Sequence, residues 1–449
     1  MLSTPVVSLG SDHLGNQLYM KRDDLLPFSF GGNKVRIAQE FFAHMRKQGN
    51  DCIVGYGNAR SNLSRAIANM AASKGIACHI ISPTDDDGTR TQTGNSRIVS
   101  ACDATFHICN KDNVAQTVAA VMEQCRKEGL SPYYIYGDRF GRGNEATAAE
   151  AYAKAYDEIH SGYDYIFLAT GTGMTQAGLL AGRRRNGGKE TIVGISVARS
   201  AQMETEILKR YTDAYTTKYG LEPIEAEDIH VTDAYLCGGY GSYDERITDT
   251  IFRVLRTYGI PLDPTYTGKA FYGMEEYLRM HNIREKRVLF LHTGGTPLFF
   301  DLMTSPCVTS CRDAGALLTF LQRIDTSLPT SLSSRVDLNA YAQKVLQSGR
   351  VLCVEHNGDI VCAALFYCND HQSGNAYLTL LGTLPEYEGK GYGSLVLSAA
   401  EQAAKREGMT SFHLDTEYQN THAVQFYRRH GYTTSYTSEK LHMAKELCS

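Results

Sequence analysis

Short apolar runs recur along the first two thirds of the chain, and stretches with helical spacing separate them. The runs show little polar alternation, which is typical of strands that are buried on both faces of a parallel sheet. They occupy residues 52–54, 78–81, 133–136, 165–168, 192–195 and 288–291. The apolar periodicity of helices is found between them at 63–74, 114–127 and 146–159. This alternation predicts an open α/β fold with a parallel sheet.

The rhythm changes near residue 308. Helical periodicity is found beyond it at 314–324 and 338–347, and strand-like runs at 351–356 and 360–367. The Asn357-Gly358 pair between the two runs is a strong hairpin signal. A chain of 449 residues also exceeds what one hydrophobic core supports. We therefore predict two domains, residues 1–307 and 308–449.

The composition is that of an ordinary globular protein, with 43% hydrophobic residues, 21% charged residues and a net charge of −4. This balance does not favour nucleic acid or a membrane surface as a partner. No apolar run is long enough to span a bilayer, and residues 1–16 lack the basic start and apolar core of a signal peptide. We expect a cytoplasmic protein.

Twelve cysteines are present, and none forms a Cys-x-x-Cys pair. Cys307 and Cys311 come closest to ligand spacing, but no second Cys/His pair follows them. Most of the others lie in apolar, strand-like surroundings, as at Cys52 and Cys78. We predict reduced core cysteines without disulfides and without a metal site, and a solvated loop at residues 85–87, which are three aspartates.

The first stretch with chemical content is Gly31-Gly32-Asn33-Lys34, between a strand-like run and a helical one. Two glycines allow the backbone to approach a ligand closely. A partly desolvated lysine beside them can lose its proton and form a Schiff base. Taken alone, the motif also fits a Gly-Gly turn followed by a surface lysine.

A second stretch, Gly171-Thr172-Gly173-Met174-Thr175, follows a buried strand and opens a helix. Backbone N–H groups at such a helix end form a phosphate site. The stretch lacks the Gly-Lys-Ser/Thr ending of a P-loop, so the phosphorylated ligand need not be a nucleotide.

A third strand-to-helix junction contains Ser61 and Asn62. These side chains either cap the helix or hold a substrate carboxylate at its positive end. A reactive lysine, a phosphate site and a carboxylate site together suggest pyridoxal phosphate and an amino acid.

Seven separated segments occur in the order and spacing of one enzyme group. They are residues 21–24, 31–34, 61–62, 169–178, 238–241, 266–270 and 292–295. On these segments, residues 1–303 resemble the D-cysteine desulfhydrases and 1-aminocyclopropane-1-carboxylate (ACC) deaminases, which are fold type II, tryptophan-synthase-β-like enzymes. The resemblance implies two open α/β subdomains, a pyridoxal 5'-phosphate cofactor, an amino-acid substrate and a homodimer.

By position, the resemblance makes Lys34 the Schiff-base lysine and the base at the substrate Cα, with Asn33 near the ring hydroxyl of the cofactor. The phosphate would lie on Gly171, Thr172, Gly173, Met174 and Thr175. Thr267 would stand beside the pyridine nitrogen.

The resemblance places the substrate carboxylate on Ser61 and Asn62. Tyr240 and Tyr266 would face the substrate, and both count with Ser61 among the expected catalytic residues. His292 ends a buried strand, and we interpret it as a hydrogen-bonded structural histidine.

Thr267 discriminates between the two activities of this group. Ring-opening deaminases typically have a glutamate there, and a carboxylate would keep the pyridine nitrogen protonated and deepen the electron sink. A neutral hydroxyl favours β-elimination, in which the leaving group takes the electron pair. The chain departs from the desulfhydrase pattern at residues 37–39, at Asn58-Ala59-Arg60 and at Met174. Arg60 beside the carboxylate site would admit a second acid group or a bulkier substrate.

Glycines at 389, 391 and 393 follow a strand-like run and open a helix, which suits a pyrophosphate. With Asn420 and the Phe426-Tyr427 pair downstream, residues 312–445 resemble the GNAT acetyltransferases. The resemblance implies acetyl-CoA as cosubstrate, bound by Gly389, Gly391, Gly393 and Asn420, although Glu388 stands where Gln or Arg is usual. Tyr427 would protonate the departing thiolate. No base stands out, and Glu417 or a water is a guess.

Three hypotheses follow for the whole chain. The first is a bifunctional enzyme that joins a β-eliminating lyase, acting on a small and possibly D-configured amino acid, to an N-acetyltransferase. The second replaces elimination by β-replacement, which makes a β-substituted alanine that the other domain acetylates. The third is an amino-acid sensor with one inactive domain, and the presence of Lys34, the phosphate site and both tyrosines argues against it.

Overall fold

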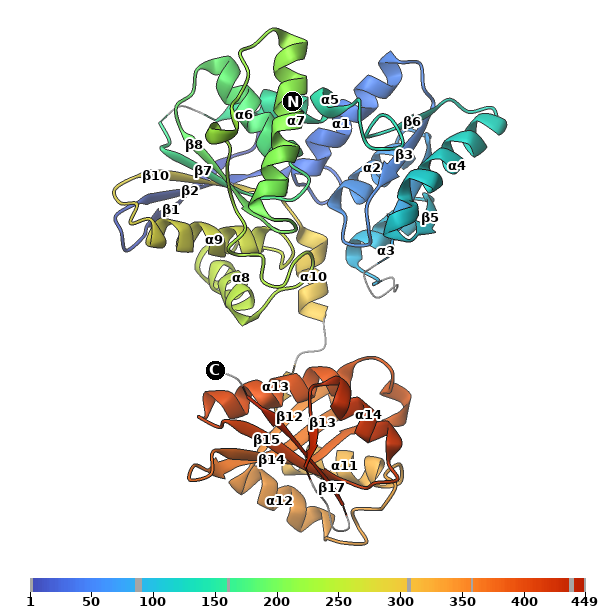
Figure 1. Cartoon of the computed structure of the whole chain (residues 1–449), viewed down its shortest axis with the longest axis vertical. Helices are drawn as coiled ribbons and strands as arrows, with labels where there is room; N and C mark the ends of the chain where they lie inside the picture. Colours follow the sequence, from blue (N-terminus) through green and yellow to red (C-terminus); the bar gives the residue numbers. More distant parts are fainter. Residues whose placement is uncertain are drawn as a thin grey trace. The chain divides into compact units, whose positions relative to one another are not determined.

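The computed structural model of the chain describes residues 3–84, 91–159, 162–304, 308–356, 358–435 and 440–447. The chain divides into two compact units, Met1–Met303 and Thr304–Ser449 (Figure 1). Our predicted domain boundary falls a few residues after this division. The Asp85–Asp87 run, Cys307 and Asn357 lie outside the described residues.

The larger sheet of the first unit has six strands in the order β1-β2-β10-β7-β8-β9. The strands are β1 (Val6–Ser11), β2 (Gln17–Arg22), β7 (Tyr165–Thr170), β8 (Thr191–Ser196), β9 (His230–Thr232) and β10 (Arg287–His292). All are parallel to their neighbours except β1, which pairs antiparallel with β2. The parallel sheet that the continuous apolar runs predict is therefore present.

The smaller sheet of the first unit has four parallel strands in the order β5-β4-β3-β6. They are β3 (Cys52–Tyr56), β4 (Ala77–Pro83), β5 (Thr105–Cys109) and β6 (Pro132–Tyr134). The predicted strand 133–136 is thus displaced, and β6 ends at Tyr134. The chain turns there because Gly137 adopts a left-handed conformation with φ of 95° and donates a hydrogen bond to the Tyr134 carbonyl.

Ten helices accompany these two sheets among the residues described for the first unit. They are α1 (Asn33–Lys47), α2 (Asn62–Ala72), α3 (Gly94–Ala101), α4 (Val114–Lys127), α5 (Glu145–Ala155), α6 (Met174–Asn186), α7 (Ala201–Tyr219), α8 (Glu245–Tyr258), α9 (Thr267–Met280) and α10 (Thr296–Thr304). Figure 1 shows α6 and α7 on one side of the larger sheet and α8 and α9 on the other.

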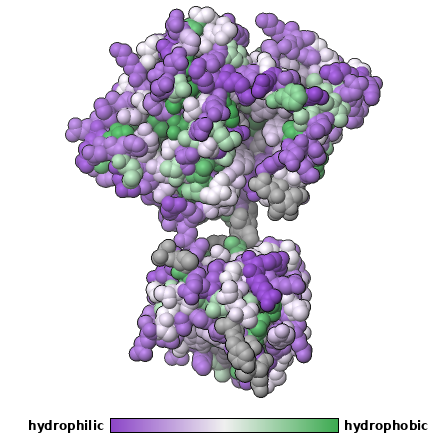
Figure 2. All heavy atoms as spheres, viewed as in Figure 1, coloured by the Kyte–Doolittle hydropathy of each residue, from purple (hydrophilic) through white to green (hydrophobic). Residues whose placement is uncertain are grey.

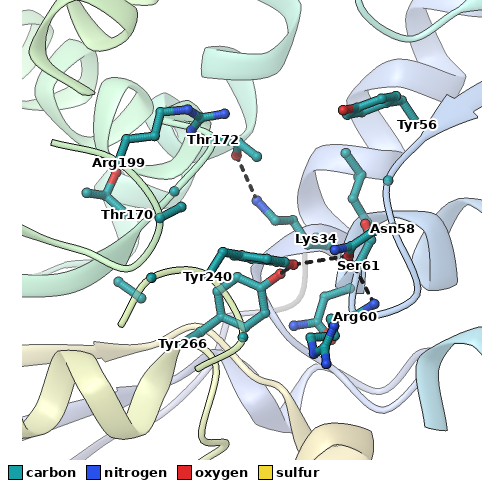
Figure 3. Close-up of a pocket in the computed structure, with 18 of the residues that line it drawn as sticks. Lys34, Tyr56, Asn58, Arg60, Ser61, Thr170, Thr172, Arg199, Tyr240 and Tyr266 are labelled. Atoms are coloured by element: carbon teal, nitrogen blue, oxygen red, sulfur yellow. Dashed lines mark hydrogen bonds between the residues drawn. The ribbon is translucent and has the colours of Figure 1, made fainter. Parts of the chain in front are cut away.

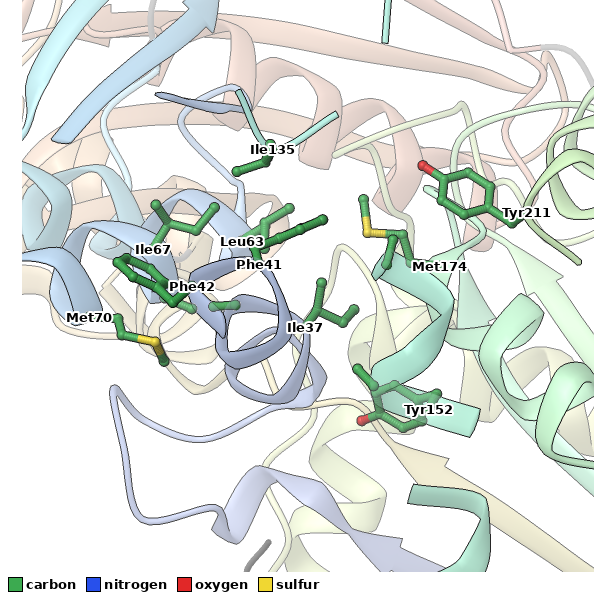
Figure 4. Close-up of a cluster of buried hydrophobic side chains, with 14 of the residues drawn as sticks. Ile37, Phe41, Phe42, Leu63, Ile67, Met70, Ile135, Tyr152, Met174 and Tyr211 are labelled. Atoms are coloured by element: carbon green, nitrogen blue, oxygen red, sulfur yellow. The ribbon is translucent and has the colours of Figure 1, made fainter. Parts of the chain in front are cut away.

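One apolar cluster joins the two sheets. Ile37 and Phe41 on α1 and Leu63 and Ile67 on α2 pack in the same cluster as Met174 at the start of α6 (Figure 4). The cluster also includes alternate residues of β7, whose intervening residues face α8 and α9 in a second cluster. The shared core therefore fixes the lysine-bearing helix α1 against the glycine-rich turn that opens α6.

A buried ionic network anchors α1 on its other side. The guanidinium of Arg36, which is 2% exposed, contacts Asp23 at 3.1 Å and Glu158 at 2.6 Å. Lys21 donates to Glu158 at 2.9 Å, and Tyr152 donates to Asp23. Burial works against the charge on Arg36, but Asp23 and Glu158 outweigh it and raise its pKa. The two carboxylates thus compensate for the cost of burying this charge.

The second unit is built on one seven-stranded sheet in the order β11-β12-β13-β14-β15-β17-β16. The strands are β11 (Val308–Ser310), β12 (Arg350–His356), β13 (Asp359–Asp370), β14 (Asn375–Thr383), β15 (Ser411–Thr416), β16 (Thr433–Ser435) and β17 (Leu441–Glu446). Only the pair β14–β15 is parallel. β12 and β13 form the predicted hairpin, with Gly358 at a φ of 88°.

The described helices of the second unit are α11 (Ala314–Asp325), α12 (Leu338–Ser348), α13 (Tyr392–Arg406) and α14 (Thr421–Arg429). Figure 1 shows α13 and α14 on one side of this sheet and α11 and α12 on the other. Hydrophilic side chains cover much of the visible face in Figure 2. Among the described residues no helix combines the length and the apolarity needed to cross a bilayer.

The ionic network yields a stability prediction. Arg36→Ala leaves Asp23 and Glu158 buried without their cation, so the first unit is expected to lose about 3–5 kcal/mol of unfolding free energy. The measurement is urea unfolding, followed by circular dichroism and by the absorbance of bound cofactor. Arg246→Ala is the matched control, because the side chain of Arg246 is 61% exposed and its pair with Asp244 is worth little. If Arg36→Ala does not fold, Asp23→Asn replaces it. A loss near that of the control would contradict this account.

Candidate active site

A cavity of about 840 Å³ lies in the first unit. The carboxyl ends of β3 and β4 contribute Tyr56 and Pro83, and the end of β7 contributes Thr170. The turns after these strands and the loop 238–242 complete the wall. Ligands of open α/β sheets bind at the carboxyl ends of the strands, so this is the expected location of an active site.

Lys34 is the second residue of α1 and reaches into the cavity, where its Nζ lies 3.3 Å from the hydroxyl of Thr172 (Figure 3). Burial lowers its pKa from 10.5 to about 8, and the Glu204 carboxylate opposes that shift. The amine is therefore neutral far more often than that of a surface lysine. The interpretation as a surface lysine, which the motif alone left open, does not hold.

Glycine is required at both positions before Asn33. Gly31 and Gly32 have φ values of 66° and 96°. A Cβ at Gly31 would lie 2.0 Å from the Asp24 carbonyl oxygen, and one at Gly32 would lie 2.8 Å from the Thr293 carbonyl oxygen. The turn can bring α1 this close to neighbouring backbone only without side chains.

The turn that includes Gly171, Thr172 and Gly173 lines the cavity and ends at the amino terminus of α6. Gly173 is the left-handed N-cap, with φ of 77°. The N–H groups of this helix end and its dipole provide an anion site. Asn33 donates from Nδ2 to the Thr175 hydroxyl at 2.8 Å, which ties the start of α1 to the same site.

Two groups behind this turn were missed by the sequence reasoning. Thr170 donates to the buried Glu204 at 3.1 Å, and Arg199, on the cavity wall, contacts the same carboxylate at 3.3 Å. Burial raises the pKa of Glu204, and Arg199 opposes the shift. No local motif marks either residue, because Glu204 lies on α7 and approaches the site only in the folded chain.

The side chain of Met174 does not lie in the cavity, where the resemblance placed this residue with the phosphate site. Its side chain is fully buried in the apolar cluster of Figure 4 and does not line the cavity. As the first residue of α6, it has an N–H with no partner inside the helix, and only that group belongs to the predicted phosphate site.

The opposite wall of the cavity carries two tyrosines. The hydroxyls of Tyr240 and Tyr266 are 2.5 Å apart, and Tyr240 also donates to Asn58 Oδ1 at 3.5 Å. Burial raises the pKa of Tyr266 well above its usual range, and the Tyr240 hydroxyl adds to the shift. The phenol of Tyr266 is therefore protonated at neutral pH and can serve as a hydrogen-bond donor.

Ser61 and Asn62 lie on the cavity wall and also serve the helix behind them. The Ser61 hydroxyl accepts from the Ser64 N–H at 3.1 Å, so it caps α2. Asn62 Oδ1 accepts from Asn95 Nδ2 at 2.9 Å. Arg60 lines the cavity next to them, and its Nε would lie 2.9 Å from a Cβ at Gly241.

Thr267 is buried at the start of α9 and does not line the cavity. Its hydroxyl donates to Asp263 Oδ2 at 2.8 Å and accepts from the Asp263 N–H at 2.8 Å. The Asp263 carboxylate, which is 1% exposed, also accepts from three backbone N–H groups. Burial raises its pKa, and these hydrogen bonds oppose the shift.

His292 is a structural residue, as predicted. Its Nε2 donates to the Pro261 carbonyl at 2.9 Å, and its Nδ1 accepts from the Gly294 N–H at 3.1 Å. Both ring nitrogens are therefore occupied by backbone groups.

In the second unit, the glycines of the predicted pyrophosphate loop open α13. Gly389 and Gly391 have φ values of 73° and 80°, and Gly391 is the N-cap of the helix. Gly393 follows in the first turn, where a Cβ would lie 3.6 Å from the ring of Phe426. Asn420 caps α14 through a bond from the Ala423 N–H at 3.1 Å.

Tyr427 is 8% exposed and packs against the rings of Phe426 and Tyr432. Burial raises its pKa. Glu417, which we suggested as a base, accepts from Thr330 at 2.6 Å and pairs with Arg335 at 2.9 Å. These bonds lower its pKa, which makes it a weaker base.

Comparison with known proteins agrees with this geometry. The family model described as pyridoxal-phosphate dependent enzyme matches residues 2–294. The chain belongs to the pyridoxal-phosphate-dependent enzyme family. The acetyltransferase (GNAT) family model matches residues 320–432. The chain is therefore an enzyme with a fold type II unit that uses pyridoxal phosphate and a GNAT unit that uses acetyl-CoA.

The similar proteins cover the first unit. The D-cysteine desulfhydrase of Yersinia pestis (strain Pestoides F) is 30% identical over 311 residues, which are 66% of this chain and 93% of that protein. The D-cysteine desulfhydrase of Salmonella newport (strain SL254) is 29% identical over 307 residues, covering 65% of this chain and 90% of that protein. A crystal structure of an ACC deaminase homologue is 26% identical with a TM-score of 0.60, covering 68% of this chain and 94% of that one.

The residues around the cavity fit pyridoxal phosphate. Lys34 offers an amine of lowered pKa, and the turn from Gly171 to Gly173 offers an anion site within reach of the same cavity. Asn33, next to Lys34, donates to the Thr175 hydroxyl in the first turn of α6 and so links the lysine to the anion site. The cavity thus offers an amine, an anion site and an amide within one space, which is the set of groups that this cofactor needs.

The lowered pKa of Lys34 predicts a pH dependence. In the cofactor-free protein, the rate of pyridoxal phosphate capture is expected to rise with pH and to level off above about 8, as the amine loses its proton. An unperturbed lysine would keep the rate climbing to about 10.5. Absorbance at the band of bound cofactor follows the capture. Lys47→Ala on the same helix is the control and should keep the wild-type profile, whereas Lys34→Ala should capture none covalently. A profile without a plateau would contradict the shifted pKa.

Proposed function

We propose that the first unit catalyses β-elimination on a small, possibly D-configured, β-substituted amino acid, and that the second unit acetylates an amine. The Lys34 amine, opposed across one cavity by the Tyr240–Tyr266 pair, carries the first part of the proposal. Similarity to the D-cysteine desulfhydrases supports the reaction type. Assembly as a homodimer, which the resemblance implies, and a cytoplasmic location are part of the same proposal.

In this proposal Lys34 anchors the cofactor, and Gly171, Thr172, Gly173 and Thr175 bind its phosphate. Pyridoxal phosphate, when bound, supplies an electron sink that acidifies the hydrogen at the substrate Cα. Once the substrate amine takes its place on the cofactor, Lys34 would accept that proton, because its lowered pKa favours the neutral form of the free amine. The electron pair from the Cα–H bond forms the new double bond to Cβ, and the leaving group departs with the pair of the Cβ bond.

The substrate is held from the other wall. Ser61 and Asn62, at the amino terminus of α2, would receive its carboxylate, as the positive end of a helix favours an anion. Tyr240 and Tyr266 would face the side chain, and Tyr266 would supply a proton to the leaving group, since its raised pKa keeps the phenol protonated at neutral pH. Arg60 on the same wall supports a substrate that carries a second acid group.

Thr267 supports elimination rather than ring opening. Its hydroxyl is neutral and is committed to Asp263, so the buried carboxylate interacts with a hydroxyl instead of facing the cavity. A ring-opening reaction needs the deeper electron sink that a carboxylate beside the pyridine nitrogen provides.

Lys34→Ala and Tyr266→Phe test the lyase proposal. The purified protein is scanned by absorbance before and after addition of D-cysteine, and sulfide and pyruvate are measured. Lys34→Ala is expected to lose the band of the bound cofactor and at least about 10²-fold in rate. Tyr266→Phe should keep the band and lose roughly 10²-fold in kcat.

Tyr272→Phe is the control for the tyrosine variant, because Tyr272 lies on α9, which begins directly after Tyr266, and outside the cavity wall. Wild-type protein that binds the cofactor but releases no sulfide would overturn the desulfhydrase assignment. It would leave β-replacement, in which a nucleophile adds at Cβ and the second unit acetylates the product. Tethering two sites raises the local concentration of a shared product, which favours that alternative if elimination is absent.

The acetyltransferase part is tested at Tyr427. A buried phenol keeps its proton until the departing sulfur takes it, so Tyr427→Phe is expected to lower acetyl transfer by about 10²-fold while acetyl-CoA binding is retained. Release of CoA is followed with a panel of amino acids as acceptors, and binding by calorimetry. Tyr367→Phe on β13 serves as the control. Equal losses in both variants would remove Tyr427 from the mechanism.

A further inference from the structure

A cluster of sulfur and imidazole groups lies in the smaller sheet, apart from both sites. Cys52 begins β3, His79 lies on β4 and Cys125 lies on α4, which packs against β4, β5 and β6. One ligand atom from each of the three lies within 4.8 Å of the others, and all three residues are buried. Figure 1 shows α4 beside the small sheet.

The distance between the two sulfur atoms is similar to that between two thiolates bound to one metal ion. The Sγ atoms of Cys52 and Cys125 are 3.9 Å apart. Two thiolates on a tetrahedral zinc ion, each at about 2.3 Å, lie roughly 3.8 Å apart. The sulfurs therefore already have the spacing that an ion between them requires.

His107 on β5 lies beside His79 and can orient the imidazole ring of His79. His79 Nδ1 and His107 Nε2 are 2.9 Å apart, which leaves Nε2 of His79 for a metal. Histidine ligands of metals are oriented in this way by a partner on their other nitrogen.

We propose that Cys52, Cys125 and His79 bind a divalent cation of the zinc class, with His107 as the orienting partner. Two thiolates and an imidazole are the donor set that zinc prefers, and two thiolate charges neutralise the ion in a buried place. His107 is partly exposed, so the cluster is connected to solvent on that side.

The site would join strand β3, strand β4 and helix α4 at a distance from catalysis. Cys52 is the first residue of β3, whereas the cavity is lined by Tyr56 at the other end of the same strand. The ion would thus stabilise the small sheet and take no part in the lyase reaction. This inference does not depend on the proposed function.

The test is a titration of the untagged, full-length holoenzyme with Co²⁺ in a phosphine reductant, followed by displacement with Zn²⁺. One equivalent of Co²⁺ should produce thiolate-to-cobalt charge-transfer absorbance and the visible bands of a tetrahedral ion. Cys52→Ala should abolish these bands, and His107→Gln should keep them with about 10–100-fold weaker binding.

Cys353→Ala is the matched control, because Cys353 is equally buried but lies in the second unit. The cofactor absorbance of each variant confirms that the first unit is folded. Zn²⁺ should also raise the thermal midpoint of the wild type and leave that of Cys125→Ala unchanged. Absence of stoichiometric binding, or thiolate bands that persist in Cys52→Ala, would overturn the proposal.

Discussion

The buried charge of Arg36 is the interaction on which the first unit depends. Arg36 and Lys34 are two residues apart on α1, so their side chains point about 200° apart around the helix. The burial of Arg36 is compensated by carboxylates, because Asp23 and Glu158 accept from it at 2.6–3.1 Å. This pairing fixes the rotation of α1 about its axis. With that rotation fixed, Lys34 has one direction available, which is the cavity between the two sheets.

The two cations of α1, Arg36 and Lys34, have different roles because their surroundings shift their pKa values in opposite directions. Arg36 is matched by carboxylates, and they raise its pKa against the effect of burial. Lys34 has a hydroxyl, Thr172, within hydrogen-bond distance, and burial lowers its pKa to about 8. The first arrangement holds a charge and stabilises the fold. The second destabilises a charge and so prepares an amine for covalent chemistry with the cofactor.

In the smaller sheet the cavity and the Cys/His cluster lie near opposite ends of the parallel strands. Parallel strands place all their carboxyl ends at one edge, where the turns after β3 and β4 provide Ser61, Asn62 and the wall of the cavity. Near the opposite edge Cys52 lies close to His79 and Cys125, where no catalytic group is needed. Turns and loops at one edge can thus vary with the substrate while the other edge holds the sheet together.

The sequence by itself determined the elements whose signals are local. Continuous apolar runs indicated the parallel strands. Gly31-Gly32-Asn33-Lys34 and the Gly171–Gly173 turn indicated two stretches that contribute to the cavity wall, because a turn and the helix it opens are encoded by adjacent residues. Only the tertiary structure showed that Asp263 engages Thr267, that Glu204 lies behind the phosphate turn, and that Met174 points into the core. It alone brought Cys52 within 3.9 Å of Cys125, which is 73 residues away. Most of these contacts join residues that are far apart in the chain. They form only when the sheets and helices pack, so local sequence patterns do not predict them.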